Sequence, residues 1–353
     1  MKVAFLILNQ RDQIRRCEAY IRNNLDLEYD LVFVQEDWEK EQNLPFAPCH
    51  TIDLPNVSYI PETEYKNENY CLVLINSDKT MPFLIEHMYP GMVNINDKVV
   101  AQSLINDFGK FDFIRSNLTD EFDDEDWVFV KPRISSGGFS TNPLCYNKRQ
   151  YKEVKHFAND GRHLIQESVD TYDILLLSFV NNGKDLVLFE IVEQEFRPSS
   201  IGNVFTSYLQ SNLALRDEYA DLIATTKEFF HFIGYTNYKG FFGVQFLRKD
   251  GKLIPIDFNL RNGPVAMELE FRKLMDTRMY KAIPFFFGNE NSKEYLENPR
   301  NYERYRCYAE IDGKPVTDFK FTPNYEGRVK ISSGKTSGTF REDYDMYVEK
   351  IID

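Results

Sequence analysis

Residues 244–261 read VQFLRKDGKLIPIDFNLR, and they are the most informative segment of the sequence. Two runs of β-forming residues flank an Asp-Gly pair, which is the strongest short-range signal for a β-hairpin. Side chains two residues apart on a strand share one face, so Asp257, Asn259 and Arg261 are expected to line up. Gln245 lies on the paired strand and can join them.

The residues alone leave two interpretations of this hairpin open. Oxygen ligands from Gln245, Asp257 and Asn259 suit Mg²⁺, which keeps some of its waters and shares phosphate oxygens with a nucleotide. Arg261 lies beyond them, where it can hold a phosphoryl group. Alternatively, an amphipathic hairpin shows the same alternation when its polar side chains simply face solvent.

A second motif is a strand followed by a loop of glycine and serine. The strand expected at 127–131 delivers Lys131, and the loop at 134–141 contains Ser135, Ser136, Gly137 and Gly138. Paired glycines permit positive φ and a close approach of backbone N–H groups to an anion, so such loops bind phosphates. An ordinary flexible hairpin loop is the alternative.

A third motif follows the strand expected at 163–166. This motif contains the polar residues Gln166, Glu167 and Asp173. It also contains Val169, whose backbone N–H and carbonyl are the groups of interest. A strand that ends in an acid between apolar neighbours can form an adenine slot, in which backbone groups read the amino edge and a carboxylate reads the ribose. A strand that leaves the core into a turn explains the same residues.

Composition narrows the class of partner. The chain has 353 residues, and 42 Lys plus Arg against 55 Asp plus Glu give a formal net charge of −13. This acidity disfavours nucleic acid as a partner, and no run reaches the roughly 20 apolar residues that a membrane span needs. The 5 cysteines include no C-x-x-C pair, so neither a zinc site nor a disulfide framework is indicated and a reducing cytoplasm is expected.

The remaining pattern is typical of an α/β protein. Strands are expected at 3–8, 31–35 and 71–76 with a helix at 12–23, which together indicate a small parallel unit. Residues 45–68 are expected to be mostly loop because they contain four prolines. A helix is expected to begin at Asn96 as its cap and to run to about residue 107. Further strands are expected at 174–180, 186–194, 241–248, 253–259, 307–311 and 319–321, and further helices at 148–157, 218–233, 267–275 and 279–286.

In order and spacing, the three motifs resemble the ATP-grasp superfamily over about residues 96–264. The resemblance is closest to the branch that includes carbamoyl-phosphate synthetase and many carboxylate–amine ligases. It implies that Lys98 and Lys131 bind nucleotide phosphates and that the glycine loop closes over them. The implied adenine and ribose contacts are Gln166, Glu167, Val169 and Asp173, the implied metal ligands are Gln245, Asp257 and Asn259, and the implied phosphate-binding catalytic residue is Arg261.

Three positions depart from the family pattern. Asp257 stands where the family usually has Glu, Leu260 where it usually has Pro, and Asp173 where Glu is commoner. The shorter carboxylate of Asp257 still permits metal binding. None of these changes removes a function outright, so an active enzyme is expected.

The fold class that the resemblance implies is α/β, with an α+β grasp. A parallel α/β domain that precedes the grasp would occupy residues 1–96. The ATP-grasp domain would follow at 97–290 as two α+β subdomains that clasp ATP, with the glycine-loop subdomain at about 110–175. A small C-terminal extension would occupy 291–353.

The activity implied by the resemblance is ATP-dependent ligation of a carboxylate to an amine through an acyl phosphate, with release of ADP and phosphate. ATP and Mg²⁺, which Mn²⁺ can replace, are the implied cofactors. Small carboxylates and amines are the implied substrates, including amino acids or a carrier-bound acyl group, and a homodimer is the default assembly. Arg197 can hold a substrate carboxylate, or form a surface salt bridge. A non-catalytic ATP-binding sensor and a bicarbonate-dependent carboxylase of the same fold are the alternatives.

Overall fold

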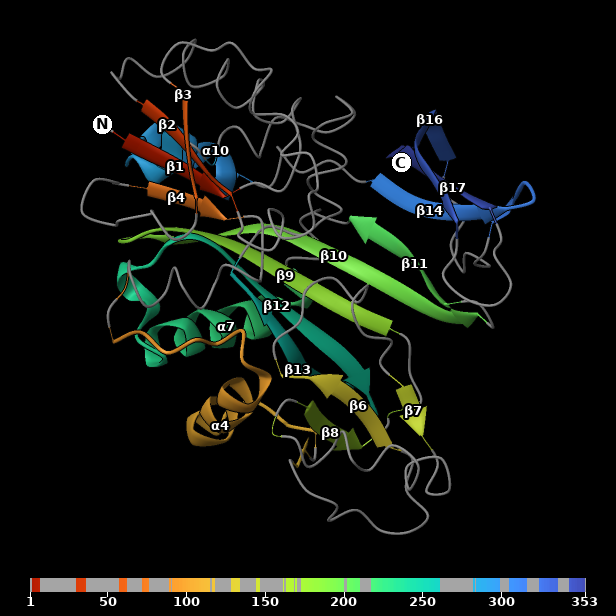
Figure 1. Cartoon of the computed structure of the whole chain (residues 1–353), viewed down its shortest axis with the longest axis horizontal. Coiled ribbons are helices and arrows are strands. Elements are labelled where there is room, and N and C mark those ends of the chain that lie inside the picture. The colour runs from red at the N-terminus through yellow and green to blue at the C-terminus, as the bar shows by residue number, and fades with distance from the viewer. Residues whose placement is uncertain are drawn as a thin grey trace.

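The structure is a computed structural model. It describes residues 2–6, 30–35, 57–61, 72–75, 89, 91–114, 116–117, 128–133, 144–146, 161, 163–167, 169, 173–199, 202–209, 217–260, 282, 284–298, 305–315, 324–335 and 343–352. Figure 1 shows the described strands gathered into three sheets, with helices α4 (Lys98–Phe108) and α7 (Ala220–Phe232) on one side of the largest. No helix in these ranges is long and apolar enough to cross a membrane.

The N-terminal sheet has four strands whose neighbours all run parallel. In spatial order they are β3 (Val57–Pro61), β2 (Asp30–Gln35), β1 (Lys2–Leu6) and β4 (Leu72–Ile75). Strands β1, β2 and β4 agree with the three expected from the sequence, and the helix expected at 12–23 lies outside the described residues. Residues 45–68 were expected to be mostly loop, and within them Val57–Pro61 forms β3, because Val-Ser-Tyr-Ile favours a strand and Pro61 is tolerated at a sheet edge. The other residues of this range lie outside the described residues.

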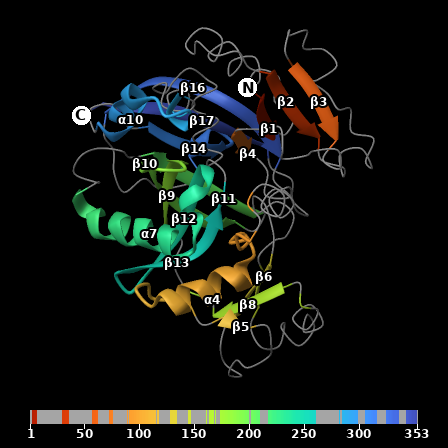
Figure 2. The ribbon, with the colours of Figure 1, turned by 90° about the vertical axis from the view of Figure 1, so that its left-hand side faces the viewer.

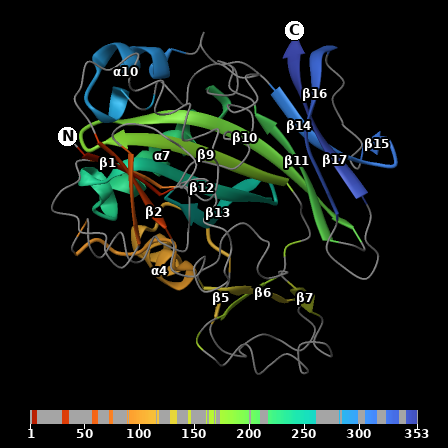
Figure 3. The same cartoon turned by 45° about the horizontal axis from the view of Figure 1, so that its top comes forward.

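The central sheet has nine strands, and all its neighbours run antiparallel. In spatial order they are β13 (Lys252–Asn259), β12 (Lys239–Lys249), β9 (Asp173–Asn182), β10 (Leu186–Ser199), β11 (Gly202–Leu209), β14 (Tyr305–Ile311), β17 (Asp343–Ile352) and β16 (Asn324–Lys335), with β15 (Lys314–Pro315) paired to β14. Figure 3 shows the last strands of the chain continuing this sheet beyond β11. Strands β11, β16 and β17 were not expected from the sequence, while the strand expected at 319–321 lies outside the described residues.

The third sheet is small and antiparallel. Its order is β5 (Ser116–Asn117), β8 (His163–Glu167), β6 (Val128–Pro132) and β7 (Leu144–Tyr146). Figures 1 and 2 show it next to α4 and away from the N-terminal sheet. The strands expected at 127–131 and 163–166 are confirmed as β6 and β8. The loop at 134–141 and the helix expected at 148–157 lie outside the described residues.

Helix α4 begins one residue later than the sequence suggested. The cap is Asp97 rather than Asn96, since the Asp97 side chain accepts a hydrogen bond from the Val99 backbone N–H at 3.0 Å. The helix ends at Gly109, which has φ of 67° and donates its N–H to the carbonyl of Ile105. Helix α7 matches the expected helix, and it is followed by a single 3₁₀ turn, η4 (Tyr235–Asn237), while α10 (Glu290–Glu297) lies further along the chain.

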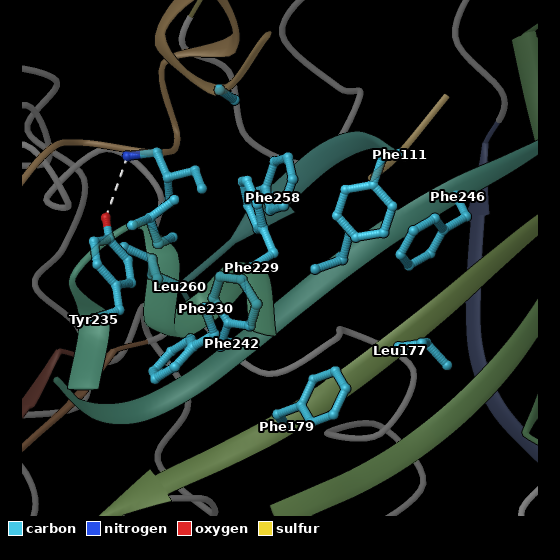
Figure 4. Packing of buried hydrophobic residues seen from close by; sticks show 14 of the residues in the cluster. Phe111, Leu177, Phe179, Phe229, Phe230, Tyr235, Phe242, Phe246, Phe258 and Leu260 are labelled. Carbon is cyan, nitrogen blue, oxygen red and sulfur yellow. Dashed lines mark hydrogen bonds between the residues drawn. The ribbon is translucent and has the colours of Figure 1, made fainter. Parts of the chain in front are cut away.

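The largest hydrophobic cluster lies between the central sheet and α7. Figure 4 shows aromatic rings from α7, β12 and β13 packed together in this layer. Phe229 is fully buried at its centre, with its ring 5.2 Å from that of Phe108 on α4 and 5.3 Å from that of Phe258 on β13 (ring centroids). Helix α4, helix α7 and strand β13 are therefore fixed against one another by one aromatic layer.

Two buried tyrosines at η4 hold the chain segments that flank the candidate site. The Tyr238 hydroxyl lies within hydrogen-bond distance of the carbonyls of Phe241 and Leu260, at 2.9 and 3.0 Å. The Tyr235 hydroxyl donates to the carbonyl of Val93. It also accepts from the N–H of Ile95, the bond that is dashed in Figure 4. The loop before α4 and the end of β13 are thus anchored to the same turn.

Candidate functional site

The β12–β13 hairpin carries the three residues expected to bind a metal ion. Gln245 pairs directly with Asp257, and Gly243 pairs with Asn259. Directly paired residues of antiparallel strands point to the same face, and Asp257 and Asn259 are two residues apart on one strand. Gln245, Asp257 and Asn259 therefore share one face of the sheet, as the alternation in the sequence predicts.

The opposite face of this hairpin packs into the core. Val244 and Phe258 are 0% and 3% exposed and belong to the aromatic cluster beneath α7. Asn259 is 9% exposed, whereas the side chain of Asp257 is 25% exposed. The polar set therefore lies on the face of the sheet that is turned away from α7, and its carboxylate is partly accessible.

A β-bulge interrupts β13 beside this carboxylate. Asp257 and Pro255 pair with consecutive residues of β12, so Ile256 between them has no partner on that strand. The carbonyl oxygen of Ile256 instead accepts a hydrogen bond from Lys131 Nζ at 3.0 Å. Because Lys131 comes from β6, this bond joins the small sheet to the central sheet.

Two buried lysines meet at this part of β13. Lys98 Nζ lies 3.4 Å from Asp257 Oδ1, and the Lys98 side chain is 7% exposed. Lys131 is 9% exposed and acts on the neighbouring peptide group. Two ammonium groups around one carboxylate carry an excess positive charge, which favours the binding of an anion at this point.

Burial changes the protonation of one of these lysines. Desolvation lowers the pKa of the Lys131 ammonium from 10.5 to about 8; the Asp257 carboxylate opposes this shift, and the Lys98 ammonium adds to it. Lys131 therefore loses its charge at a pH only slightly above neutrality. An additional negative charge in the site would restore it.

The three-dimensional arrangement has clear counterparts among solved structures. No protein-family model matches the sequence, and no curated protein matches it. The L-amino acid ligase of Bacillus licheniformis superposes with a TM-score of 0.65 at 12% identity, over 99% of this chain and 93% of that one. The biotin carboxylase domain of the Hydrogenobacter thermophilus 2-oxoglutarate carboxylase gives 0.55 at 10% identity, over 99% and 86%.

A third solved structure extends the similarity. The carboxyaminoimidazole ribonucleotide synthase of Aspergillus clavatus gives a TM-score of 0.55 at 10% identity, over 98% of this chain and 92% of that one. All three are ATP-grasp enzymes. The chain has the ATP-grasp fold.

Within the ATP-grasp fold, the expected adenine segment lies on β8. The Glu167 carboxylate binds Lys249 Nζ of β12 at 2.6 Å, and Gln166 Nε2 donates to Ser116 Oγ at 2.8 Å. Both side chains are thus held by protein partners. The Glu167–Lys249 ion pair is a second link between the small sheet and the central sheet of the grasp.

For some of the other expected site residues the structure gives only a position on a strand, and several lie outside the described residues. Asp173 begins β9 and pairs with Glu195, and Arg197 on β10 pairs with Val204. Val169 is half-buried just beyond β8. The described residues do not include Ser135, Ser136, Gly137, Gly138 or Arg261.

The sequence analysis missed an ion pair that fixes the two lysines relative to each other. Arg133 Nη2 lies 2.6 Å from Asp97 Oδ2, and the Arg133 carbonyl accepts the backbone N–H of Lys98 at 3.0 Å. Asp97 and Arg133 are neighbours of the two lysines in sequence, so the end of β6 and the start of α4 are joined next to the site. In the sequence, the one indication of this ion pair was that Arg133 lies two residues after Lys131, so that on an extended strand both side chains share one face.

The expected metal ligands include a single carboxylate, that of Asp257. Among the described ranges, no group of three or more His, Cys, Asp or Glu side chains is placed to hold a metal ion. The expected set instead combines the carboxylate of Asp257 with the amide oxygens of Gln245 and Asn259. Such a set suits a hard ion that keeps several waters.

Proposed function

We propose that this protein is an ATP-dependent ligase that joins a small carboxylate to an amine through an acyl phosphate and releases ADP and phosphate. The observation that carries the proposal is the contact of Lys98 with Asp257 and of Lys131 with the adjacent carbonyl of Ile256, beside Gln245 and Asn259. Ammonium groups for phosphate oxygens and oxygen donors for Mg²⁺ are the parts that phosphoryl transfer requires.

The matched structures support this choice of nucleotide and ion. The Aspergillus clavatus enzyme was solved with ATP, and the Hydrogenobacter domain with MgADP and bicarbonate. The Bacillus licheniformis enzyme is an amino acid ligase and spans almost the same length as this chain. Amino acids are therefore the first carboxylates and amines to test.

The residues present fit a nucleotide–magnesium complex. Asp257, Asn259 and Gln245 would hold the ion, which supplies charge neutralisation between the β- and γ-phosphates. Lys98 and Lys131 would bind phosphate oxygens, exchanging their present contacts on β13 for the nucleotide. Arg261 would steady the transferred phosphoryl group, as the family resemblance implies.

The chemistry needs no covalent bond to the protein. The substrate carboxylate attacks the γ-phosphorus and ADP leaves; an amine then attacks the acyl carbon, loses a proton, and displaces phosphate. The chain contributes position and positive charge, which is how most phosphoryl transfer is catalysed. The loop at 134–141 would cover the acyl phosphate and exclude water.

The resemblance to the ATP-grasp superfamily also suggests a substrate-binding residue, a domain division, an oligomeric state and a location. Arg197 would hold a substrate carboxylate. The division into 1–96, 97–290 and 291–353, a homodimer and a cytoplasmic location complete the proposal. A carboxylase remains the second candidate because one matched structure contains bicarbonate. The complete ligand set of Gln245, Asp257 and Asn259 favours catalysis over a nucleotide sensor.

Nucleotide product analysis tests the proposal. We expect the protein with ATP and Mg²⁺ to release ADP and phosphate when pooled amino acids and small carboxylates are added, and to release little without them. Splitting the pool would then name the substrates. AMP and pyrophosphate would contradict the acyl-phosphate mechanism, and ADP release that requires bicarbonate would favour the carboxylase. ATP binding without turnover for any pool would favour the sensor.

A pH profile tests the role of Lys131. Since the pKa of its ammonium is about 8, the free enzyme carries the charge below this pH and loses it above. We expect kcat/KM for ATP to fall above pH 8, approaching tenfold per pH unit, because kcat/KM reports the free enzyme's ionisation. In Lys131→Arg the guanidinium stays charged, so this fall should disappear. The same decline in both proteins would show that another group titrates.

A further inference from the structure

Asn96 has a side-chain amide without any hydrogen-bond partner. The residue is 5% exposed, and neither its Nδ2 nor its Oδ1 makes a hydrogen bond. A buried amide that loses its contacts with water and gains none in return costs free energy, and such groups are rare in folded proteins. This side chain therefore calls for an explanation.

The loop that carries Asn96 is not loosely placed. The backbone N–H of Asn96 donates to Asn94 Oδ1 at 3.1 Å. The backbone N–H of Ile95 donates to the Tyr235 hydroxyl at 3.3 Å. On the other side, Asp97 is held by Arg133 at 2.6 Å. The backbone on both sides is held by buried or half-buried groups, so the position of the Asn96 Cα is fixed, while the amide itself has no partner.

The position of Asn96 relates it to the candidate site. It lies two residues before Lys98, whose ammonium contacts Asp257. Successive Cα atoms are about 3.8 Å apart, so the Cα atoms of Asn96 and Lys98 lie within about 7.6 Å of each other. Both residues are at the N-terminal end of the 11-residue helix α4, where the helix dipole favours an anion.

We propose that the Asn96 amide is a ligand-binding group for the magnesium nucleotide. Its Nδ2 donates to a phosphate oxygen, and its Oδ1 accepts a hydrogen bond from a water in the hydration shell of the ion. Lysine offers donors alone and a carboxylate acceptors alone, whereas an amide offers both, as this pair of partners requires. This inference rests on the proposed function, and it adds a residue that the family resemblance does not supply.

The proposal predicts opposite effects on stability and on binding. Asn96→Leu keeps the branched shape and removes both polar atoms. The free protein should become more stable, with a rise in Tm of about 2 °C or more, because the unpaired amide is no longer buried. The affinity for MgATP should fall about tenfold or more, because two hydrogen bonds are lost. A residue that only supports the fold would not produce this opposition.

The experiment compares the full-length wild type, Asn96→Leu and Asn96→Ala by thermal unfolding without nucleotide and by calorimetric titration with MgATP and MgADP. Asn96→Ala serves if leucine does not fit, and it should weaken nucleotide binding to a similar degree. Asn106→Leu is the matched control, since Asn106 is an exposed asparagine on the same helix. It should leave nucleotide affinity unchanged.

The outcomes separate this inference from the proposed function. Unchanged affinity in Asn96→Leu and Asn96→Ala, with tight binding by the wild type, would overturn the role of Asn96 and leave the ligase proposal standing. A lower Tm for Asn96→Leu with normal binding would likewise overturn it, because the amide would then serve the fold. Failure of the wild type to bind MgATP would overturn the proposed function, and this inference with it.

Discussion

Asp257→Ala is expected to lower turnover by about three orders of magnitude, the largest effect on activity that the site predicts. Asp257 is the one carboxylate among the three expected metal ligands, and it is also the counter-charge of Lys98 at 3.4 Å. Removing it takes away an expected metal ligand and leaves two buried ammonium groups to repel each other. Both effects act on the step that transfers the phosphoryl group.

The measurement is steady-state release of ADP, with circular dichroism to confirm that the variant is folded. Asp107→Ala is the control, since Asp107 is an exposed acid on α4 and should leave turnover at the wild-type level. A second readout follows from electrostatics: the Asp257 carboxylate raises the pKa of Lys131, so its removal should lower this pKa below about 8. Wild-type rates in Asp257→Ala would refute the assignment of the site.

Phe229→Ala is expected to give the largest loss of stability, about 3–5 kcal/mol. Phe229 is fully buried, and its ring lies 5.2 Å from that of Phe108 and 5.6 Å from that of Phe111 (ring centroids). Truncation removes buried apolar surface and leaves a cavity between rigid aromatic neighbours that cannot close around it. The free energy of unfolding is measured by denaturant titration at constant m value.

The same helix supplies the control for this variant. Phe232 is 50% exposed on α7, so Phe232→Ala should cost less than about 1 kcal/mol. Equal losses in the two variants would mean that the aromatic layer between α7 and the sheet does not determine stability.

The hairpin at 239–259 could be predicted from the sequence because its signals are local. The Asp-Gly turn sets the pairing, and alternation sets the face that Asp257 and Asn259 share. The strands that contain Lys131 and Gln166 could be predicted equally well, since each is a short run of β-forming residues. These elements are also the ones that carry the resemblance to the ATP-grasp superfamily.

What the sequence could not provide depends on contacts between distant segments. The bond from Lys131 to the carbonyl of Ile256 joins residues 125 positions apart, and it exists because a bulge frees that carbonyl. Asp97, the cap of α4, is also paired with Arg133 from the end of β6, 36 positions further along the chain. The unpaired amide of Asn96 is visible only once its surroundings are known.

The bulge at Ile256 also constrains how this gene can change. On the turn side of the bulge, Ile254 pairs with Leu247, and on the other side Asp257 pairs with Gln245, so both halves of β13 present the correct side chains to each face. The extra residue lies between them. Deleting residue 256 would leave Pro255 and Asp257 adjacent and paired with Phe246 and Gln245 as they are now, so each side chain would keep its face. The loss would be the unpaired carbonyl of Ile256, which accepts the hydrogen bond from Lys131. The length of β13 at this point therefore determines the link between the two sheets, and the faces of the hairpin do not depend on it.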